Sequence, residues 1–579
     1  MDTITFKVND VEISAPEGST ILQAVQQADI NYAIIDIPTL FYLKGIKETD
    51  ESGVCVVEVV GEKELAPAWS YPIHEGMEVL TDSEKVNEAV KKALKGILSL
   101  HNYNCVNCIR TANCELQNLL HKYNVHDEET TDKNQNELDE STVIIRDSNK
   151  CIRCNRCVEV CNAVQGVGAI EAAGTGTDAK VVAVSEAGLA ETSCVKCGQC
   201  IAVCPVAAVY EQDNTNEVFA ALADSEKFVI VQTAPSVRAA LGEEFAFPLG
   251  VDVEGRLAAA LRILGFDKVF DTKFGADLTV MEEATEFIDR VQNGGVLPMM
   301  TSCCPGWIKY CEHFYPEMID NLSSCKSPQQ MFGAVIKSYY AEKMSIDKEN
   351  IVVVGVMPCT AKKFEISRAE QNDAGVPDVD ISITTRELAR MLKKAEIQFE
   401  AMSAEEFDQP LGIGSGAGVI FGATGGVMEA ALRTAVEKLT GDKKIQLEFN
   451  DIRGVTGIKE ASYSINGKKI KVAVVSGLNN AKKLLDKIQD GSSEYHFIEV
   501  MGCPGGCVNG GGQPQQPADV RAKIDIRSIR ADALYSNDEK NKIRKSHENP
   551  GIIELYRAYL EKPGSKIAHK LLHTSYVKR

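Results

Sequence analysis

The chain has 579 residues, of which 62 are basic and 82 acidic, and its net charge is −20. Apolar residues (44%) and charged residues (25%) occur in ordinary globular proportions, which excludes a wholly disordered, collagenous or coiled-coil protein. The acidic balance argues against nucleic acid as a partner, because binding phosphates requires an excess of Lys and Arg.

The 19 cysteines are the most informative feature of the composition. The sequence has no run of 18 apolar residues and no signal peptide at its start, so we expect no membrane span and a cytoplasmic location. Cysteines in that compartment indicate metal ligation or thiol chemistry rather than disulfides.

The predicted elements change character along the chain. Residues 1–80 predict a small α/β unit with strands at ITFKV, VEIS and GVCVVEVV, and residues 83–122 are mostly helical. A polar stretch over 126–141 predicts a linker. From about residue 213, apolar strand-like runs alternate with helical segments, which favours α/β layers with partly parallel sheets.

Residues 150–212 contain an internal repeat of C-x2-C-x2-C-x3-C. Its first copy is Cys151, Cys154, Cys157 and Cys161, and its second is Cys194, Cys197, Cys200 and Cys204. This is the bacterial two-cluster ferredoxin pattern, in which the fourth Cys of each run ligates the other 4Fe–4S cluster. One cluster is therefore expected on Cys151, Cys154, Cys157 and Cys204, and the other on Cys194, Cys197, Cys200 and Cys161. Zinc also binds four thiolates, but the repeated run makes a zinc site improbable.

A further group of ligand residues precedes this repeat. His101, Cys105, Cys108 and Cys114 have a spacing that alone fits either a zinc site or a 4Fe–4S cluster with one imidazole ligand. The neighbouring ferredoxin pattern favours iron–sulfur.

Three later motifs carry a resemblance to a known family. TSCCPGW (301–307), MPCTAKKFE (357–365) and EVMGCPGGCVNGGGQP (499–514) resemble the three signature motifs of iron-only (FeFe) hydrogenases. The resemblance covers essentially the whole chain. It implies an α/β multidomain protein of four parts: a β-grasp, plant-ferredoxin-like domain (1–80), a small helical His/Cys cluster domain (81–125), a two-cluster bacterial-ferredoxin-like domain (126–212) and a large two-lobed α/β catalytic domain (213–579).

The same resemblance implies the catalytic cofactor, an H cluster. This is a 4Fe–4S cube joined through a cysteine to a two-iron centre that carries CO, cyanide and a bridging azadithiolate. The motif match assigns the cube to Cys304, Cys359, Cys503 and Cys507, with Cys507 as the bridge. It assigns contacts with the two-iron centre to Ala234, Pro235, Ser236, Lys362, Pro328, Met357, Phe421, Val427 and Met501.

The family's proton path maps onto five residues, listed from the cofactor outward: Cys303, Glu283, Ser323, Glu286 and Arg290. Cys303 would exchange protons with the bridging amine, a role that suits a thiol because its pKa can be moved towards neutrality. MEEATEFIDR (281–290) predicts a helix with Glu283, Glu286 and Arg290 on one face. Without the resemblance, that face would be interpreted as an exposed, salt-bridged surface.

The first domain departs from the family pattern. Three positions expected to hold the Cys ligands of a 2Fe–2S cluster are Phe41, Ser52 and Trp69, and only Cys55 is left. One thiolate cannot hold a cluster that normally takes four. The sequence therefore predicts three accessory 4Fe–4S clusters and no 2Fe–2S cluster.

The sequence favours a hydrogenase that interconverts protons and H2 with ferredoxin as electron partner and with maturation proteins that install the two-iron centre. A basic patch for an acidic ferredoxin would come from Lys92, Lys95 and Arg110, or from the basic C-terminal tail. Two alternatives stay open. A hydrogen or redox sensor would use the same cofactor, although such relatives tend to lose the Cys303 thiol. An electron-transfer subunit would explain only residues 1–212.

Overall fold

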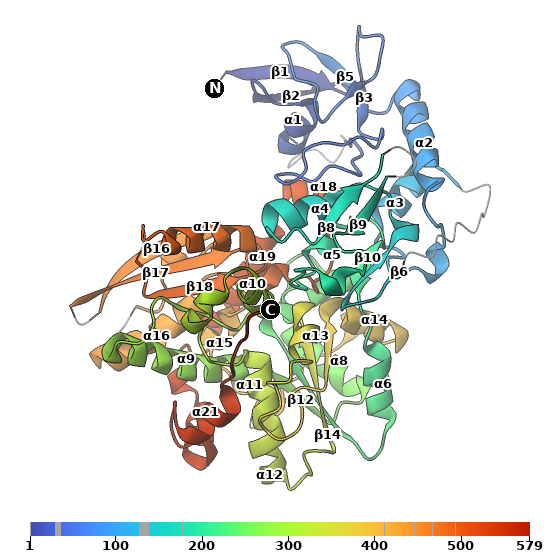
Figure 1. Ribbon diagram of the computed structural model, residues 1–579. Helices are drawn as coiled ribbons and strands as arrows, with labels where there is room; N and C mark the ends of the chain where they lie inside the picture. Colours follow the sequence, from blue (N-terminus) through green and yellow to red (C-terminus); the bar gives the residue numbers. More distant parts are fainter. Residues whose placement is uncertain are drawn as a thin grey trace.

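A computed structural model describes residues 2–28, 36–126, 138–175, 179–409, 411–443, 446–465, 467–492 and 494–579. Most of the predicted linker, residues 127–137, lies outside these ranges. The molecule is mixed α/β, with a small N-terminal domain at one end, the Cys-rich segments in the middle and two catalytic lobes beyond them (Figure 1). No helix in the described ranges is long and apolar enough to cross a membrane.

The N-terminal domain is a five-stranded sheet with one helix. Its elements are β1 (Thr3–Val8), β2 (Val11–Pro16), α1 (Ile21–Ala28), β3 (Val56–Val59), β4 (Ala66–Pro67) and β5 (Glu78–Leu80). The strand order is β2-β1-β5-β3-β4, with β1 and β5 parallel. Phe6, Val57 and Val79 are buried in the core between sheet and helix. This is the β-grasp arrangement expected from the sequence.

The Cys-rich middle segment consists of short elements. They are α2 (Glu84–Leu98), α3 (Glu115–Lys122), β6 (Leu138–Asp139), β7 (Ile144–Asp147), α4 (Arg156–Glu159), β8 (Ile170–Ala173), β9 (Lys180–Ala183), α5 (Gln199–Val203) and β10 (Val209–Glu211). The internal repeat is visible in the backbone. Asn155 (φ 59°) and Gly198 (φ 69°) occupy the same left-handed position between the second and third Cys of each run, directly before α4 and α5.

The first catalytic lobe is built on a parallel sheet. Its strands are β11 (Phe228–Thr233), β12 (Lys268–Asp271), β14 (Ile351–Met357) and β15 (Ile381–Thr384), in the order β12-β11-β14-β15. The strands are rich in buried Val and Ile because helices cover both faces. The helices of this lobe include α6 (Thr215–Ala223), α8 (Glu254–Leu264), α13 (Ala361–Glu365) and α14 (Thr385–Lys394).

The second lobe is built on a mixed sheet. Its strands are β13 (Met299–Met300), β16 (Ile458–Ile465), β17 (Lys468–Ser476) and β18 (Phe497–Met501), in the order β13-β18-β17-β16, and only the β16–β17 pair is antiparallel. The long helix α9 (Lys273–Asn293) packs against α11 (Pro328–Val335), α15 (Gly416–Ile420) and α16 (Gly426–Thr440). The remaining helices are α7 (Pro235–Arg238), α10 (Pro305–Phe314), α12 (Ala341–Met344), α17 (Leu478–Gln489), α18 (Ala518–Lys523), α19 (Ile526–Lys540), α20 (Pro550–Leu555) and α21 (Lys566–Leu572).

Candidate functional site

The predicted motif residues follow the carboxyl ends of two pairs of parallel strands, one pair in the sheet of each lobe. Ala234–Ser236 follow β11 and Cys303–Cys304 follow β13, while Cys359 follows β14 and Cys503 follows β18. The carboxyl ends of such strands form the usual ligand-binding edge of an open α/β sheet. The two lobes therefore direct all three motifs to one region.

Four thiols, of Cys304, Cys359, Cys503 and Cys507, meet in this region. Burial raises the pKa of Cys359 to about 12, and the neighbouring Cys304 contributes to this shift. Burial also raises the pKa values of Cys503 and Cys507, and Cys304 and Cys359 add to both shifts. Four mutually repelling thiolates are stable together only around a compensating cation, so this donor set fits a 4Fe–4S cube.

Glycines bring the third motif close to the second ferredoxin-like run. A Cβ on Gly511 would lie 2.2 Å from the backbone carbonyl oxygen of Cys197, so only glycine fits there. Gln199 Nε2 donates to Asn509 O at 2.9 Å, and Thr360 Oγ1 donates to Lys196 O at 2.7 Å. The absent side chain of Gly511 therefore allows another backbone segment to approach, which couples the catalytic loop to the ferredoxin-like domain.

Some of the predicted pocket residues lie close to the thiols. Phe421, Val427 and Met501 belong to one buried cluster, and the side chain of Cys303 packs against it. Lys362 Nζ donates to Ser327 Oγ at 3.1 Å and to Glu365 Oε2 at 3.2 Å. The other predicted members lie at the start of α7, at the start of α11 and at the end of β14, namely Ala234, Pro235, Ser236, Pro328 and Met357.

The predicted proton path is a connected set of side chains at its outer end. Ser323 Oγ donates to Glu286 Oε2 at 2.8 Å, and Arg290 Nη2 donates to Glu286 Oε1 at 2.6 Å. Glu283 lies one helical turn inward on α9 and is buried, close enough to raise the pKa of Cys303. The alternative interpretation of this helix face, as an exposed and salt-bridged surface, therefore applies to the Glu286–Arg290 pair but not to Glu283.

The inner end of the path is buried. Both carboxylate oxygens of Glu283 are enclosed, and the Ser323 hydroxyl and the Ser302 backbone are the groups that interact with them most closely as hydrogen-bond donors among the described residues. Burial raises the pKa of Glu283 to about 8, and the charge of Glu286 contributes. Burial likewise raises the pKa of the Cys303 thiol well above its ordinary value. The apolar surroundings of Cys303 therefore disfavour its thiolate form.

The ferredoxin-like cysteines line two separate cavities. Cys151, Cys154, Cys157 and Cys204 line one, and Cys161, Cys194, Cys197 and Cys200 line the other. The structure therefore groups the fourth Cys of each run with the first three of the other run, as the spacing predicts.

The His101 group lies beside the first of these cavities. His101 is buried, and its Nδ1 lies 2.9 Å from Lys150 O, so Nδ1 carries the hydrogen and the lone pair is on Nε2. Metal-binding histidines are typically oriented in this way. Cys105 and Cys114 each interact electrostatically with Cys108. Arg110 is buried and donates to Cys204 O at 3.1 Å, so the expectation that it forms a docking patch is wrong.

A further group of side chains, which includes Glu282 and His573, lies beside the predicted proton path. The sequence did not predict this group. His573 Nε2 lies 3.1 Å from Glu282 Oε2, although the two residues are 291 positions apart. The one sequence feature that points to this group is Cys325, because it lies two residues after Ser323 of the predicted path.

The region expected to hold a 2Fe–2S cluster has its own hydrogen bonds. Asp50 Oδ2 accepts the backbone N–H groups of Leu40 at 2.8 Å and Phe41 at 3.1 Å. Cys55 is buried, and Trp69 packs against the core of the domain.

Five family models match consecutive parts of the chain. The model "Iron only hydrogenase large subunit, C-terminal domain" matches residues 227–511, and "Iron hydrogenase small subunit" matches 524–579. A "4Fe-4S dicluster domain" matches 150–208, and the "NADH-ubiquinone oxidoreductase-G iron-sulfur binding region" matches 91–129, which favours iron–sulfur over zinc at His101. A "2Fe-2S iron-sulfur cluster binding domain" matches residues 1–84, and this match conflicts with the predicted absence of that cluster.

Whole proteins match over the same length. The chain is 47% identical to the NADP-reducing hydrogenase subunit HndD of Solidesulfovibrio fructosivorans, with 100% of both chains covered. It is 44% identical to iron hydrogenase 1 of Clostridium pasteurianum over 99% of this chain and 100% of that protein. The solved FeFe-hydrogenase HydA1 of Chlamydomonas reinhardtii aligns at a TM-score of 0.57 and 43% identity, covering 63% of this chain and 99% of that one. The motifs, the convergent thiols and these matches together show that the chain belongs to the iron-only (FeFe) hydrogenase family.

Proposed function

We propose that this enzyme reversibly reduces protons to H2 at an H cluster, with electrons exchanged through three accessory 4Fe–4S clusters. The observation that carries the proposal is the convergence of four thiols and Cys303 where the parallel strands of the two lobes end, with the buried carboxyl of Glu283 on α9 beside Cys303. Cys304, Cys359, Cys503 and Cys507 would hold the cube. When bound, the H cluster supplies redox-active iron and a basic amine for splitting or forming the H–H bond.

The chain's own residues would orient that group and keep it dry. Lys362 places a cation among the thiols, where it would face the cyanide ligands, and the cluster of Phe421, Val427 and Met501 excludes water. The hydroxyl of Ser236, at the start of α7, would donate to that group from the same lobe as Lys362. Because few covalent bonds hold the two-iron centre, these contacts would set its orientation.

The proton path would work through neutral groups. With its pKa raised to about 8, Glu283 is mostly protonated at neutral pH, as is the Cys303 thiol. A neutral carboxyl accepts a proton on one oxygen and releases one from the other, so a proton passes inward without leaving a charge in a low-dielectric site. Ser323 and Glu286 would connect Glu283 with the surface at Arg290.

The electron path would run through the two ferredoxin-like clusters. The cavity lined by Cys197 lies against the loop that carries Cys503, and the two thiols interact electrostatically. The His101 group lies beside the cavity lined by Cys151, and its Asn113 also donates to Gln515 O of the catalytic domain at 3.3 Å. Electrons would therefore enter at the His101 group or at the Cys151 cavity.

Two electron partners are supported by different observations. We propose ferredoxin, which the domain layout favours, and Lys92 and Lys95 lie on α2, the helix that leads to the His101 group. The second candidate is a subunit of an NADP-reducing assembly, because a full-length relative is named as such a subunit. The net charge of −20 opposes the approach of an acidic partner, so a local basic surface is needed in either case.

We expect matured protein to evolve H2 with both reduced methyl viologen and reduced ferredoxin. Methyl viologen reports whether the catalytic centre works, and ferredoxin reports whether the accessory clusters accept its electrons. NADPH added to the isolated chain serves as the matched comparison. Activity with viologen alone would contradict the ferredoxin proposal and favour a partner subunit, and inactivity with both, despite an intact H cluster, would contradict the hydrogenase activity.

We propose that the N-terminal domain holds no 2Fe–2S cluster, although its domain family is named for one. Phe41, Ser52 and Trp69 supply no thiolate, and Asp50 accepts the N–H groups of the loop at residues 40–41. We expect the reduced protein to show no slowly relaxing 2Fe–2S signal by electron paramagnetic resonance at temperatures where 4Fe–4S signals broaden away. A variant carrying Phe41→Cys, Ser52→Cys and Trp69→Cys is the positive control. A 2Fe–2S signal in the unmodified protein that disappears in Cys55→Ser would refute the proposal.

A further inference from the structure

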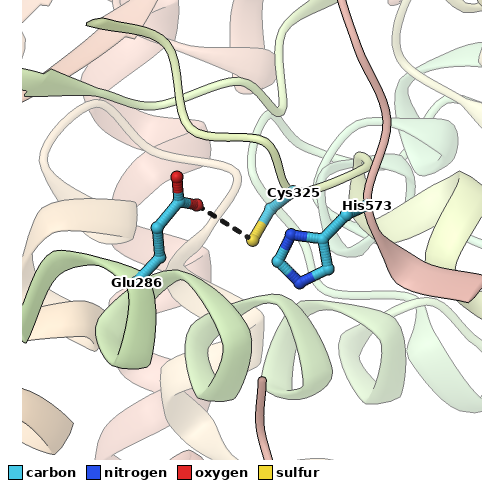
Figure 2. Close-up of side chains that lie close together, drawn as sticks. All are labelled: Glu286, Cys325 and His573. Carbon is cyan, nitrogen blue, oxygen red and sulfur yellow. Dashed lines mark hydrogen bonds between the residues drawn. The ribbon is translucent and has the colours of Figure 1, made fainter. Parts of the chain in front are cut away.

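Three metal-ligating side chains meet beside the outer half of the proton path. Glu286 comes from α9, Cys325 from the segment before α11, and His573 from the residue after α21. Figure 2 shows the Cys325 sulfur between the Glu286 carboxylate and the His573 ring. One ligand atom from each residue lies within 4.8 Å of the other two, and Cys325 Sγ is 3.8 Å from Glu286 Oε2.

Backbone pairing fixes two of these residues in place. Cys325 and His573 form an antiparallel β-bridge. On either side of it, Lys326 N donates to Leu572 O at 2.8 Å, and Thr574 N donates to Ser324 O at 2.7 Å. The positions of the thiol and the imidazole are therefore set by the main chain, and they do not depend on the contact between the two side chains.

A carboxylate orients the His573 ring. Glu282 Oε2 lies 3.1 Å from Nε2 and also accepts Gly564 N at 2.9 Å, while Glu282 Oε1 accepts the Tyr556 hydroxyl. A carboxylate can only accept, so Nε2 carries the hydrogen. In the neutral imidazole Nδ1 then carries the lone pair, which accepts from Ser324 Oγ at 2.8 Å. A carboxylate behind the remote nitrogen is the common arrangement of metal-ligating histidines.

We propose that Glu286, Cys325 and His573 form a binding site for a borderline-soft divalent transition cation such as Zn²⁺. Thiolate, imidazole and carboxylate are the ligands of Zn²⁺, and three protein ligands leave the fourth tetrahedral position for water. Mg²⁺ and Ca²⁺ prefer all-oxygen shells, so this set disfavours them. Ligand atoms around tetrahedral Zn²⁺ are about 3.5 Å apart, so the observed separations require only a small inward movement.

Binding requires the Cys325 thiol to lose its proton to solvent. The site is nearly closed, since the side chain of Glu286 is 15% exposed and that of His573 is 6% exposed. The exposed edge of Glu286 gives a cation its access. A divalent cation would also balance the two negative ligands, thiolate and carboxylate, which otherwise repel each other in a buried place.

The site has a consequence for turnover that rests on the proposed function. Glu286 Oε2 is the atom that accepts from Ser323 at 2.8 Å, and it is also the atom nearest Cys325. A cation on Oε2 would take the lone pair that receives the proton. Bound Zn²⁺ should therefore stop proton delivery without contacting the H cluster.

The binding test is zinc X-ray absorption on the purified holoprotein incubated with one equivalent of Zn²⁺, with iron content measured before and after. We expect one sulfur at about 2.3 Å and nitrogen or oxygen neighbours at about 2.0 Å. In Cys325→Ala the sulfur should be lost, and in Cys325→Ala and His573→Gln the zinc affinity should fall at least about 10-fold. Cys311→Ala is the matched control, because Cys311 is also a buried free thiol and bonds only to Tyr315 O at 3.4 Å among the contacts described.

The second measurement is H2 evolution with reduced methyl viologen as Zn²⁺ is added, relative to each variant's own zinc-free rate. Inhibition reversed by EDTA, present in Cys311→Ala and lost in Cys325→Ala, would support the proposal. A zinc shell without sulfur, or one unchanged in Cys325→Ala, would overturn it. A Cys325-dependent zinc shell with undiminished H2 evolution would support the metal site and contradict the proton path through Glu286.

Discussion

Replacing Cys303 with Ala should lower the rate of H2 evolution by about 10²–10⁴-fold, the usual contribution of a positioned proton donor. Cys303 packs against the apolar cluster of Phe421, Val427 and Met501 and is close to Glu283, so its thiol is placed to pass a proton from that carboxyl to the proposed cofactor. Water cannot replace it easily in a site lined by apolar side chains. The measurement is H2 evolution from reduced methyl viologen by matured protein, with the CO and cyanide bands of the H cluster recorded by infrared spectroscopy on the same sample.

The infrared bands separate a failure of chemistry from a failure of assembly. Cys303 precedes Cys304, a proposed ligand of the cube, so a disturbed loop would also change the bands. Cys311→Ala removes another buried thiol on α10 and should leave both bands and rate near those of the parent. Activity of Cys303→Ala within a fewfold of the parent, at equal H-cluster content, would show that protons reach the cofactor another way.

Replacing Glu283 with Gln should also lower H2 evolution by about 10²–10⁴-fold. The amide has nearly the same shape as the neutral carboxyl but cannot accept a proton on one atom and release it from another. Because burial raises the pKa of Glu283 to about 8, the parent enzyme should lose H2 evolution as pH rises through that value, when the carboxyl becomes charged. A pH–rate profile from about 6 to about 10 with reduced methyl viologen measures both effects.

The same shift links Glu283 to stability. The pKa of Glu283 is higher in the folded state than in the unfolded state. Its contribution to the free energy of unfolding is therefore largest below its ordinary pKa of 4.5 and decreases as the pH rises to about 8. Glutamine does not ionise, so Glu283→Gln removes this loss of stability. The difference between the melting temperatures of the variant and the parent should therefore increase as the pH rises over this range. Scanning calorimetry under anaerobic conditions compares the two proteins.

Asp289→Asn is the control for both measurements, because Asp289 lies on the same helix and accepts from Asn293 at 2.6 Å on the exposed surface. It removes one charge from α9 without touching the path. A rate of Glu283→Gln close to that of Asp289→Asn would rule out Glu283 as the relay. A parent profile that stays flat as the pH rises above the raised pKa would show that its ionisation does not limit turnover.

Short-range spacing in the sequence determines much of this protein's organisation. The repeated Cys runs predict two clusters with exchanged fourth ligands. In the structure, Cys204 lines the cavity of the first run and Cys161 lines the cavity of the second, as predicted. Ligands of a compact cluster lie near one another along the chain, and backbone geometry fixes the spacing that reaches them. The 3.6-residue period likewise predicts Glu283 and Glu286 on one helix face, where α9 has them.

The tertiary structure decided what depends on residues far apart in sequence and on burial. No period connects Glu286 and Cys325 with His573, which is brought to them by a β-bridge from the C-terminal tail. Burial made Arg110 a structural side chain and raised the pKa values of Glu283 and Cys303, since a charge costs free energy only where packing has removed water. The sequence by itself determined which groups can ligate metal and carry protons, and only the folded chain decided which of them share a dry, common site.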